Sequence, residues 1–448
     1  MTNIVSLIWP FLDFVYILQL EDYDTASYFK WVYTRFFKRQ LQYVGKITWT
    51  KKAQAILSVA LGLYLALIYF FWPVGVIYQL AVIVFFTCLI PLIVGLANLI
   101  CSPIDLYIKQ NTIKLAKAKL SQMPDCIVVA IAGSYGKSTV RYFANQLLNP
   151  DFAVHTPKEN HNTMFSLAQD IVNELPVKTK YYLVELGEYN VGDFKRYIGL
   201  LDPEIVVVTA IGPQHLSSFG SQAAIDSEFN DLISITKNKI HLLNAENDGI
   251  KRVFGDDVAQ IGQYNQQYLE NNFNNVNADI MSIPQLKQCA AAAVVLASAL
   301  GVSKETIQPH ITLLHPVERR MDVTEQNGIT IIDDTYNINP ESAKAALSYL
   351  ETLKGRKIIV TGGIVDQGQS SDNANIVFAD QISQVCEIAI IAQTIYAPLI
   401  IDTIKDRNKL CRVIESPHPS RTPSILKEIL QSGDNVLLQN ELPDLYWH

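Results

Sequence analysis

Cysteines are few in this sequence and do not cluster. The six cysteines of the 448-residue chain include no CxxC pair, and this spacing indicates neither a disulfide framework nor a zinc site. The net charge is −7, and basic residues gather only beside two long apolar runs. Because binding to a phosphate backbone requires a concentrated basic surface, the sequence argues against a nucleic-acid partner. A reducing, cytosolic setting and at least two soluble domains fit this composition.

Charged residues are missing altogether from two runs near the N-terminus, 53–72 and 76–100. Each run reaches the ~20 residues that a helix needs to cross a bilayer, and only "PVG" separates them. Lysines precede the first run and follow the second, so the positive-inside bias predicts a transmembrane hairpin at 53–101 with both ends in the cytoplasm. We therefore expect a protein of the inner (cytoplasmic) membrane. A helical hairpin buried in a soluble core is the alternative.

The segments that flank the hairpin are expected to lie at the membrane surface. Residues 1–52 have no basic n-region and no A-x-A-like site, so they do not resemble a cleavable signal peptide. Pro10 and Asp13 make the segment a poor spanning helix, and we expect it to lie at the interface. Residues 102–124 mix lysines with apolar residues, which suits a helix beside anionic lipid headgroups. A solvated connecting helix is the alternative there.

Short apolar runs alternate with helical stretches from Cys126 onward. This alternation predicts an α/β protein with parallel sheets covered on both faces. Two sets of such runs place one domain at 125–316 and a second at 317–448, with the joint near "LLHPVERRMDV". The Asn-rich stretch 264–280 predicts turns or a hairpin. There is no internal repeat or low-complexity tract.

The turn after the first of these runs, "GSYGKST" at 133–139, has the parts of a phosphate-binding loop. Glycines let backbone N–H groups approach phosphates, Lys137 suits the β and γ oxygens, and Ser138 suits Mg²⁺. The usual GxxxxGK[ST] spacing also requires a glycine at position 131, which is Ile131 here. The loop is therefore a short variant, and its position between a strand and a helix supports the interpretation.

"GSYGKST" resembles the nucleotide loop of the Mur ligases, the ATP-dependent amide-forming enzymes of peptidoglycan precursor synthesis. Four later stretches agree with that family in order: "TPKENHNT", "VELGEYNVGDF", "IGPQHLSSFGS" and "IDDTYNINPESAKAAL". The likeness is closest to MurF-type, membrane-anchored ligases. It implies a P-loop parallel-sheet ATPase domain, a C-terminal Rossmann-like domain, and a membrane segment in place of the domain that holds the UDP end of the substrate.

The resemblance implies a role for individual residues. Lys137 would hold the β and γ phosphates of ATP, while Ser138 and Thr139 reach the metal. Glu185 and His215 would ligate a second Mg²⁺, and Arg320 would reach the γ-phosphate as a catalytic group. The remaining residues expected at the ATP are Gly133, Ser134, Tyr135, Gly136, Asp334 and Asn337, with Asn339 nearby. From "KENHNT" we expect Asn162 and Thr163 to contact the substrate.

Several positions depart from the pattern of the family. Phe229 stands where these ligases carry a lysine that becomes carbamylated and helps to hold the second metal. Glu228 is expected to replace that ligand if the helix is shifted by one residue, with Asp226 and Asp231 as further candidates. Gln285 and Cys289 occupy positions where a histidine and an asparagine near the adenine are usual.

These parts predict a ligase in which a substrate carboxylate attacks the γ-phosphate of ATP and an amine then displaces phosphate. The expected substrates are a cell-wall peptide precursor and an amino acid or dipeptide, and membrane lipid and membrane-associated proteins of cell-wall synthesis are expected partners. A ligase that builds a poly-amino-acid capsule is a close alternative. A non-catalytic, nucleotide-binding scaffold is another, because Phe229 cannot form a carbamate. A transport ATPase fits poorly, since the hairpin is too small to form a pathway.

Overall fold

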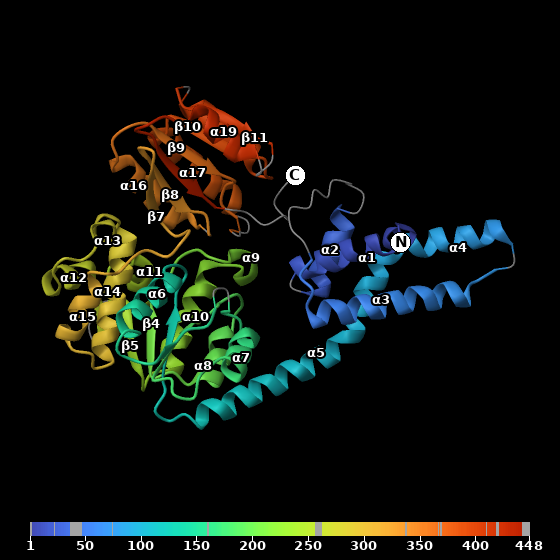
Figure 1. Cartoon of the computed structure of the whole chain (residues 1–448), viewed down its shortest axis with the longest axis horizontal. Helices are drawn as coiled ribbons and strands as arrows, with labels where there is room; N and C mark the ends of the chain where they lie inside the picture. The colour runs from blue at the N-terminus through green and yellow to red at the C-terminus, as the bar shows by residue number, and fades with distance from the viewer. Residues whose placement is uncertain are drawn as a thin grey trace. The chain divides into compact units, whose positions relative to one another are not determined.

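The computed structural model describes residues 2–21, 23–35, 47–73, 75–158, 161–255, 262–336, 338–365, 367, 370–408, 410–417 and 421–440. The chain divides into two compact units (Figure 1). The first comprises the described residues up to Asn111, and the second those from Thr112 to Asn440.

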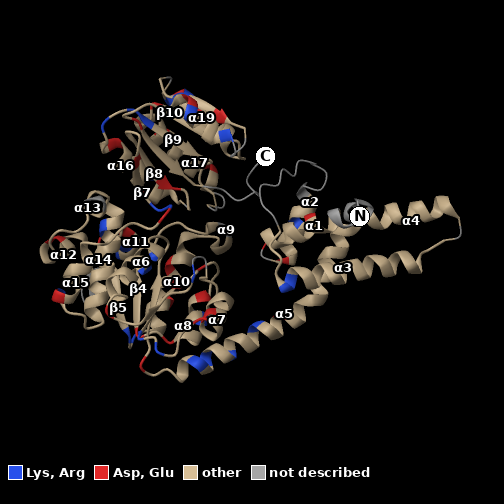
Figure 2. Ribbon diagram, viewed as in Figure 1, with Lys and Arg blue, Asp and Glu red and all other residues tan. Residues whose placement is uncertain are grey.

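The N-terminal unit is helical. Its helices are α1 (Thr2–Leu20), α2 (Thr25–Arg35), α3 (Lys51–Phe70), α4 (Val76–Cys88) and α5 (Ile90–Ser121), of which α5 continues into the second unit. Phe11 of α1 packs edge-to-face on Tyr64 of α3, with 5.4 Å between ring centroids. In the described part of the chain, two helices, α3 and α5, are long and apolar enough to cross a membrane. Figure 2 shows α4 and most of α3 free of charged residues, and lysines along the C-terminal half of α5.

The second apolar run, predicted as one span, is two helices in the structure. Helix α4 ends at Cys88 and α5 begins at Ile90. Pro91 explains the break, because proline has no N–H to donate to a carbonyl of the preceding turn. The predicted basic segment 102–124 is mostly the continuation of α5 rather than a separate helix.

The second unit begins with a six-stranded parallel sheet in the order β2-β3-β1-β4-β5-β6. Its strands are β1 (Ile127–Ala132), β2 (Val154–His155), β3 (Tyr181–Glu185), β4 (Ile205–Val208), β5 (Ile240–Asn244) and β6 (Gly262–Tyr264). The helices around it are α6 (Lys137–Leu148), α7 (Met164–Asn173), α8 (Asp193–Leu201), α9 (Leu216–Phe219), α10 (Gln222–Ile235), α11 (Asp248–Phe254), α12 (Gln266–Asn272), α13 (Ala278–Ser282), α14 (Pro284–Ala299) and α15 (Lys304–Ile311).

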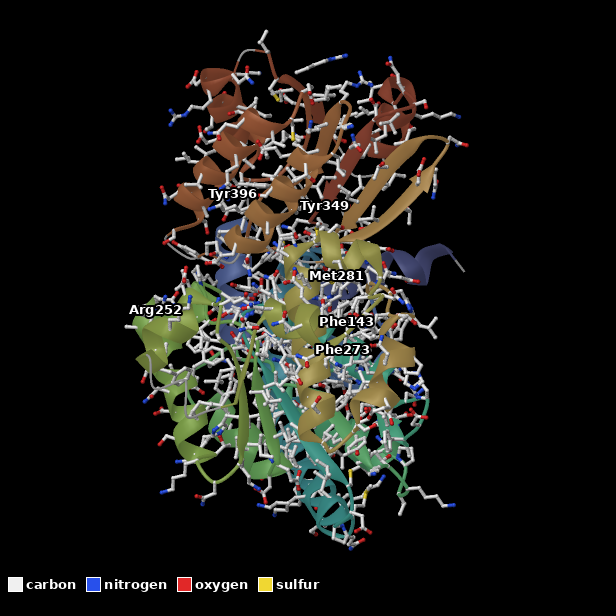
Figure 3. The ribbon with its side chains drawn as sticks, turned by 90° about the vertical axis from the view of Figure 1, so that its left-hand side faces the viewer. Phe143, Arg252, Phe273, Met281, Tyr349 and Tyr396 are labelled. Atoms are coloured by element: carbon white, nitrogen blue, oxygen red, sulfur yellow. The ribbon has the colours of Figure 1, made fainter. Side chains whose placement is uncertain are left out.

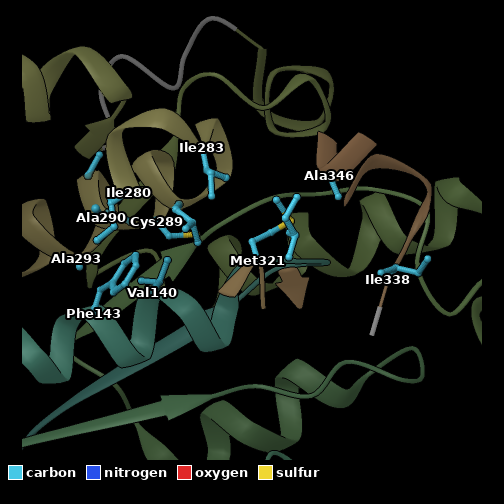
Figure 4. Close-up of a cluster of buried hydrophobic side chains, with 14 of the residues drawn as sticks. Val140, Phe143, Ile280, Ile283, Cys289, Ala290, Ala293, Met321, Ile338 and Ala346 are labelled. Carbon is cyan, nitrogen blue, oxygen red and sulfur yellow. The ribbon is translucent and has the colours of Figure 1, made fainter. Parts of the chain in front are cut away.

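Alternate residues of β1 belong to cores on opposite faces of this sheet. Val129 and Ile131 pack with α6 and α14, whereas Val128 and Ala130 pack with α7, α8 and α10, as the period of two in a strand requires. Figure 4 shows side chains of α6 facing the alanine-rich side of α14. The small alanine side chains let α14 approach α6 closely and hold the start of α6 in place.

A second, mixed sheet follows in the order β11-β10-β9-β12-β8-β7. Its strands are β7 (Asp322–Gln326), β8 (Ile329–Asp334), β9 (Lys357–Thr361), β10 (Ile388–Ala392), β11 (Arg412–Ser416) and β12 (Asn435–Gln439), and β7 alone runs antiparallel to its neighbour. Helices α16 (Pro340–Thr352), α17 (Ser371–Val385), α18 (Ala397–Arg407) and α19 (Thr422–Ile429) complete this lobe. In Figure 3, Phe143 and Phe273 lie within the first lobe, and Tyr349 and Tyr396 within the second.

The predicted α/β class is confirmed, but the hairpin expected at 264–280 is wrong. That stretch ends β6 and then forms the short helices α12 and α13. Asn265 starts α12 because its side chain accepts a hydrogen bond from the backbone N–H of Tyr268. The abundant asparagines therefore include a helix cap rather than only turns.

Candidate active site

A cleft of about 460 Å³ lies at the carboxyl ends of the parallel strands and is lined by both lobes of the second unit. Ligands of open parallel sheets bind at this edge. From the first lobe the cleft receives the loop after β1, the segment after β3 and the start of α9; from the second it receives the segment before β7 and the end of β8.

Two glycines shape the loop between β1 and α6. Gly133 has φ 142° and Gly136 has φ 82°, conformations that residues with a Cβ rarely adopt. At Gly133 a Cβ would also collide with the side chain of Thr209 and the backbone of Ala210. The loop is thus held against β4, and Gly136 is the last residue before α6, whose N-terminal N–H groups suit an anion.

The side chains of this loop fasten it to its surroundings. Ser134 donates from Oγ to the carbonyl of Gly212 (3.0 Å) and accepts from the N–H of the same residue (2.9 Å). The hydroxyl of Tyr135 accepts a hydrogen bond from Nδ2 of Asn247 (2.8 Å). Both side chains line the cleft, and these contacts hold the loop in shape.

Lys137, the first residue of α6, lies at the mouth of this loop. Its ammonium group donates to the carbonyl of Gly133 and forms an ion pair with Glu188, with 2.9 Å between Nζ and Oε1. Glu188 is 4% exposed, and burial raises the pKa of its carboxyl group although Lys137 opposes that shift. Lys137 therefore sits where the family resemblance expects it, paired with a carboxylate that sequence reasoning missed.

Glu185 ends β3 and faces α6. It is opposite Ile131 in the register, and paired residues point to the same face of a sheet. Its Oε2 accepts from the hydroxyl of Ser138 (2.7 Å), and its Oε1 accepts from Nε of Arg141 (2.6 Å). The structure thus brings Ser138 and Glu185 together as predicted, and Arg141 supplies the positive charge that a buried carboxylate needs.

His215 lines the cleft at the start of α9. Its φ of 53° is left-handed, a conformation that is uncommon for a residue with a side chain and occurs often at functional positions. Its ring packs against Tyr189, with 4.7 Å between centroids. Next to it, Oε1 of Gln214 is buried without a hydrogen-bond partner among the described residues.

Arg320 reaches the cleft from the segment between the two lobes. Arg319 and Met321 on either side have left-handed φ values of 63° and 53°. The guanidinium lies over the ring of Tyr336 at 3.8 Å from its centroid, a stacking that holds the charge in one orientation. This strained pair of residues turns Arg320 toward the cleft.

Asp334 and Asp333 end β8 with different environments. Asp334 lines the cleft, and Oδ2 accepts from Nε2 of Gln439 at 3.2 Å. Burial raises the pKa of Asp334 to about 7. Oδ1 of Asp333 instead accepts from the backbone and hydroxyl of Thr335. Asp333 therefore lies in the predicted turn, and Asp334 lines the cleft; its contact with the nucleotide stays a prediction. Asn337 lies outside the described residues.

Three further predicted positions line the cleft. Cys289 lies against the phosphate loop, with Sγ 3.8 Å from the carbonyl oxygen of Gly136, and burial raises the pKa of its thiol to about 12. Gln285 has a buried Oε1 without a hydrogen-bond partner among the described residues. Asn339 lines the cleft and caps α16 by accepting from the N–H of Ser342.

Asn162 and Thr163 line the opposite part of the cleft. Thr163 forms a capping box with Ser166 at the start of α7, and the carbonyl of Asn162 accepts from Gly187 N–H and from the hydroxyl of Tyr197. The hydroxyl of Thr163 is thus used by the helix cap, and the contact of Asn162 with the substrate stays a prediction.

Glu228 does not lie where a metal ligand is required, and this corrects the expectation from sequence. It is buried outside the cleft, and its carboxylate accepts from the backbone N–H groups of Gly192 (2.8 Å) and Phe194 (3.0 Å) at the start of α8. The negative charge therefore caps a helix. Asp226 forms an ion pair with Arg252, and Asp231 is exposed.

Phe229 points into the hydrophobic core and not into the cleft. It is 1% exposed and packs edge-to-face on Phe194, with 5.1 Å between centroids. The position of the family's modified lysine is therefore filled by packing, and α10 supplies no oxygen ligand to the cleft.

Comparison with known proteins agrees with this architecture. Residues 131–293 match the Mur ligase middle domain, and residues 319–439 match the Mur ligase, glutamate ligase domain. Together the two matches cover well over half of the chain. The chain belongs to the Mur ligase family.

Among curated Mur ligases, the UDP-N-acetylmuramoyl-tripeptide–D-alanyl-D-alanine ligase of Bacillus subtilis is 24% identical over 284 residues, which is 57% of this chain and 60% of that protein. This chain thus spans about three fifths of the length of the relative. The crystal structure of MurF from Acinetobacter baumannii superposes with a TM-score of 0.62 at 18% identity, over 74% of this chain and 77% of that one. MurF from Thermotoga maritima in complex with ADP gives 0.61 at 20%, over 74% and 80%.

The oxygen groups around α6 suit the Mg²⁺ of a Mur ligase. Hard cations prefer oxygen ligands, and the hydroxyl of Ser138 and the carboxylate of Glu185 meet at 2.7 Å beside the phosphate loop. The described residues contain no group of three or more His, Cys, Asp or Glu side chains arranged to hold a metal by themselves. A cation here therefore needs phosphate oxygens or water as additional ligands.

Sequence reasoning missed Arg141 and Glu188, which complete the charged centre of this Mur ligase. Arg141 lies four residues after Lys137, one helical turn further along α6, and that spacing was a usable signal. Glu188 follows Glu185 by three residues, beyond Gly187. A second acidic residue directly after a strand that ends in an acid was the signal there.

Proposed function

We propose that this protein is a membrane-anchored, Mg-ATP-dependent amide ligase of MurF type that acts through an acyl phosphate on a cell-wall peptide precursor. The observation that carries the proposal is the meeting of Lys137, Ser138 and Glu185 in one cleft with Arg320 opposite. A glycine-built loop, a lysine, a hydroxyl and a carboxylate are the groups that bind a nucleoside triphosphate with its cation.

Each side chain has a task in this reaction. Lys137 and the N–H groups at the start of α6 bind the phosphates, and Ser138 and Glu185 hold the cation. Mg²⁺ supplies charge neutralisation at the β and γ phosphates when it is bound. Arg320 stabilises the charge that develops on the transferred phosphoryl group, and Asp334 accepts hydrogen bonds from the ribose.

The substrate carboxylate attacks the γ-phosphorus, and ADP leaves. The amine of the second substrate then attacks the acyl carbon, phosphate leaves, and the amine loses a proton to form the amide. The cleft between two lobes supports this scheme, because closure of such lobes excludes the water that would hydrolyse an acyl phosphate.

The relatives support a substrate class, because their names specify UDP-N-acetylmuramoyl-tripeptide and D-alanyl-D-alanine. We propose a peptide precursor of the cell wall as acceptor, either UDP-linked or lipid-linked, and an amino acid or dipeptide as donor of the amine. The apolar helices α3 and α5 support a membrane anchor. Depletion of the protein should then cause cell-wall precursors with a truncated peptide to accumulate. Such an accumulation would favour this substrate class over a capsule polymer.

The decisive experiment compares the full-length protein in detergent with Lys137→Ala. Mass spectrometry of precursors that accumulate after depletion identifies the acceptor, and ATP-dependent amide formation is then measured on it. We expect Lys137→Ala to lose at least 100-fold in rate while Lys178→Ala, on the exposed loop before β3, retains the wild-type rate. Equal rates for Lys137→Ala and wild type would contradict the proposal, and nucleotide binding without turnover by wild type would favour the scaffold.

A further inference from the structure

Three glutamates are buried among the described residues, and only Glu188 leaves an oxygen unused. Both oxygens of Glu185 and both of Glu228 accept hydrogen bonds. Glu188 is 4% exposed; its Oε1 faces Lys137, whereas its Oε2 is buried without a hydrogen-bond partner in the described part of the chain. Because leaving a buried charged oxygen unpaired is unfavourable, this arrangement suggests a ligand that is bound during function.

The backbone holds Glu188 at the cleft. Gly187 donates its N–H to the carbonyl of Asn162 (3.0 Å), and a Cβ at Gly187 would lie 2.7 Å from that oxygen. Only glycine allows the chain to pass this close, and the turn brings Glu188 back beside α6. Both Glu188 and Glu185 line the cleft.

The charge balance of Glu188 changes when a nucleotide binds. Among the described residues, Lys137 is the cation paired with Glu188, at 2.9 Å, and the proposed ligase reaction requires Lys137 at the phosphates. Glu185 lies close enough that its negative charge raises the pKa of Glu188, after the larger effect of burial. A divalent cation between the two carboxylates replaces the lost positive charge and uses the free oxygen.

We propose that Glu188 is a ligand of the second divalent cation, shared with Glu185, in place of the carbamate that Phe229 cannot form. This inference rests on the proposed ATP-dependent function. Phosphate oxygens and water provide the remaining ligands, since no third acidic, histidine or cysteine side chain in the described residues joins these two. Lys137 forms the ion pair with the carboxylate of Glu188 until the nucleotide and the cation bind.

The test counts bound Mn²⁺ rather than turnover. The full-length protein in detergent is titrated with Mn²⁺ in the presence of a non-hydrolysable ATP analogue, and free Mn²⁺ is measured by electron paramagnetic resonance. Wild type should bind two Mn²⁺ per bound nucleotide. Glu188→Gln should keep the site carried by the nucleotide and weaken the second at least tenfold. Glu204→Gln, at the opposite end of the sheet where Glu204 accepts from Val128 N–H, should match wild type.

Binding of a fluorescent ATP analogue is measured in parallel. We expect Glu188→Gln to bind it within threefold of wild type, because Lys137 remains. If Glu188→Gln does not fold, Glu188→Asp carries the test, since it keeps the charge but withdraws the carboxylate by one methylene and should weaken the second site several-fold.

Two results would overturn the inference alone: a second Mn²⁺ bound as tightly by both Glu188 variants as by wild type, or a single Mn²⁺ in nucleotide-bound wild type. Failure of wild type to bind nucleotide would instead overturn the proposed function on which the inference rests.

Discussion

At the scale of single residues, Asp334 makes stability depend on pH. Burial raises its pKa from 3.8 to about 7, so between these values the folded protein holds a proton that the unfolded chain has released. Its contribution to stability is complete below pH 3.8 and falls by about 1.4 kcal/mol per pH unit as the pH rises toward 7. We expect wild type to lose stability relative to Asp334→Asn from pH 5 to 6.5 in denaturant titrations. A difference that stays constant with pH would contradict this.

Glu228 is expected to matter for folding and not for the cation. Gln at this position can accept from only one of the two N–H groups at the start of α8 and places an amide against the other, so Glu228→Gln should destabilise by about 1–3 kcal/mol. The Mg²⁺ concentration for half-maximal rate should not change. The matched control, Asp231→Asn on the exposed side of α10, should shift thermal unfolding little. A raised Mg²⁺ requirement in Glu228→Gln would restore the role expected from sequence.

The residues of the cleft differ in how far sequence reasoning could place them. Lys137, Ser138 and Glu185 follow from the spacing of strand, loop and helix, because parallel strands bring their ends to one edge. Glu228 could not be judged in this way, since a shift of one helical position turns a side chain by about 100° and only packing decides the direction. The packing of Phe229 against Phe194 in the core determines which way the side chains of α10 point.

At the scale of elements, the end of α5 is joined to the end of α7. Ala116 is buried in the core below the first sheet, and Lys119 donates to the carbonyls of Val172 and Leu175 (2.7 Å for the latter). A lysine at the C-terminal end of a helix satisfies carbonyls that lack helical partners. The contact therefore caps the C-terminal end of α7.

We expect Lys119→Ala to loosen α7 by about 1 kcal/mol. Hydrogen exchange followed by mass spectrometry should show faster exchange in peptides from 164–175, while peptides from α6 keep their wild-type rates. Lys117→Ala, exposed on the same helix, is the control and should leave exchange unchanged. Equal exchange in both variants would show that the contact does not stabilise α7.

The elements themselves were predictable where hydrophobic periodicity is strong. The eight strands β1, β3, β4, β5, β8, β9, β10 and β12 coincide with apolar runs in the sequence, whereas the short β2 and β6 and the edge strands β7 and β11 carry too little apolar signal. The break before α5 depends on Pro91 inside an otherwise continuous apolar run. Hydrophobic composition alone predicts one span for such a run, because it takes no account of the backbone N–H that proline lacks.

At the scale of the whole molecule, topology is open to a direct test. If α3 crosses the membrane and the chain returns, a cysteine at Pro73 should react with a membrane-impermeant reagent on spheroplasts. A cysteine at Ser221, exposed in the second unit, should react only after the membrane is permeabilised. Labelling is read against the parent protein, whose exposed Cys88 sets the background. Strong labelling at position 221 in sealed spheroplasts would contradict a cytoplasmic ligase unit.

The burial of Phe229 has a consequence for how the protein matures. A ligand made from lysine and carbon dioxide exists only while the dissolved gas maintains it, and each newly made chain must acquire it after synthesis. A phenylalanine in the core cannot form a carbamate, so the proposed ligands Glu185 and Glu188 need no such modification after translation. Ligation should therefore proceed at the same rate in buffer stripped of bicarbonate and in buffer to which bicarbonate is returned. A cell that depends on this protein should likewise carry out the ligation in air depleted of carbon dioxide.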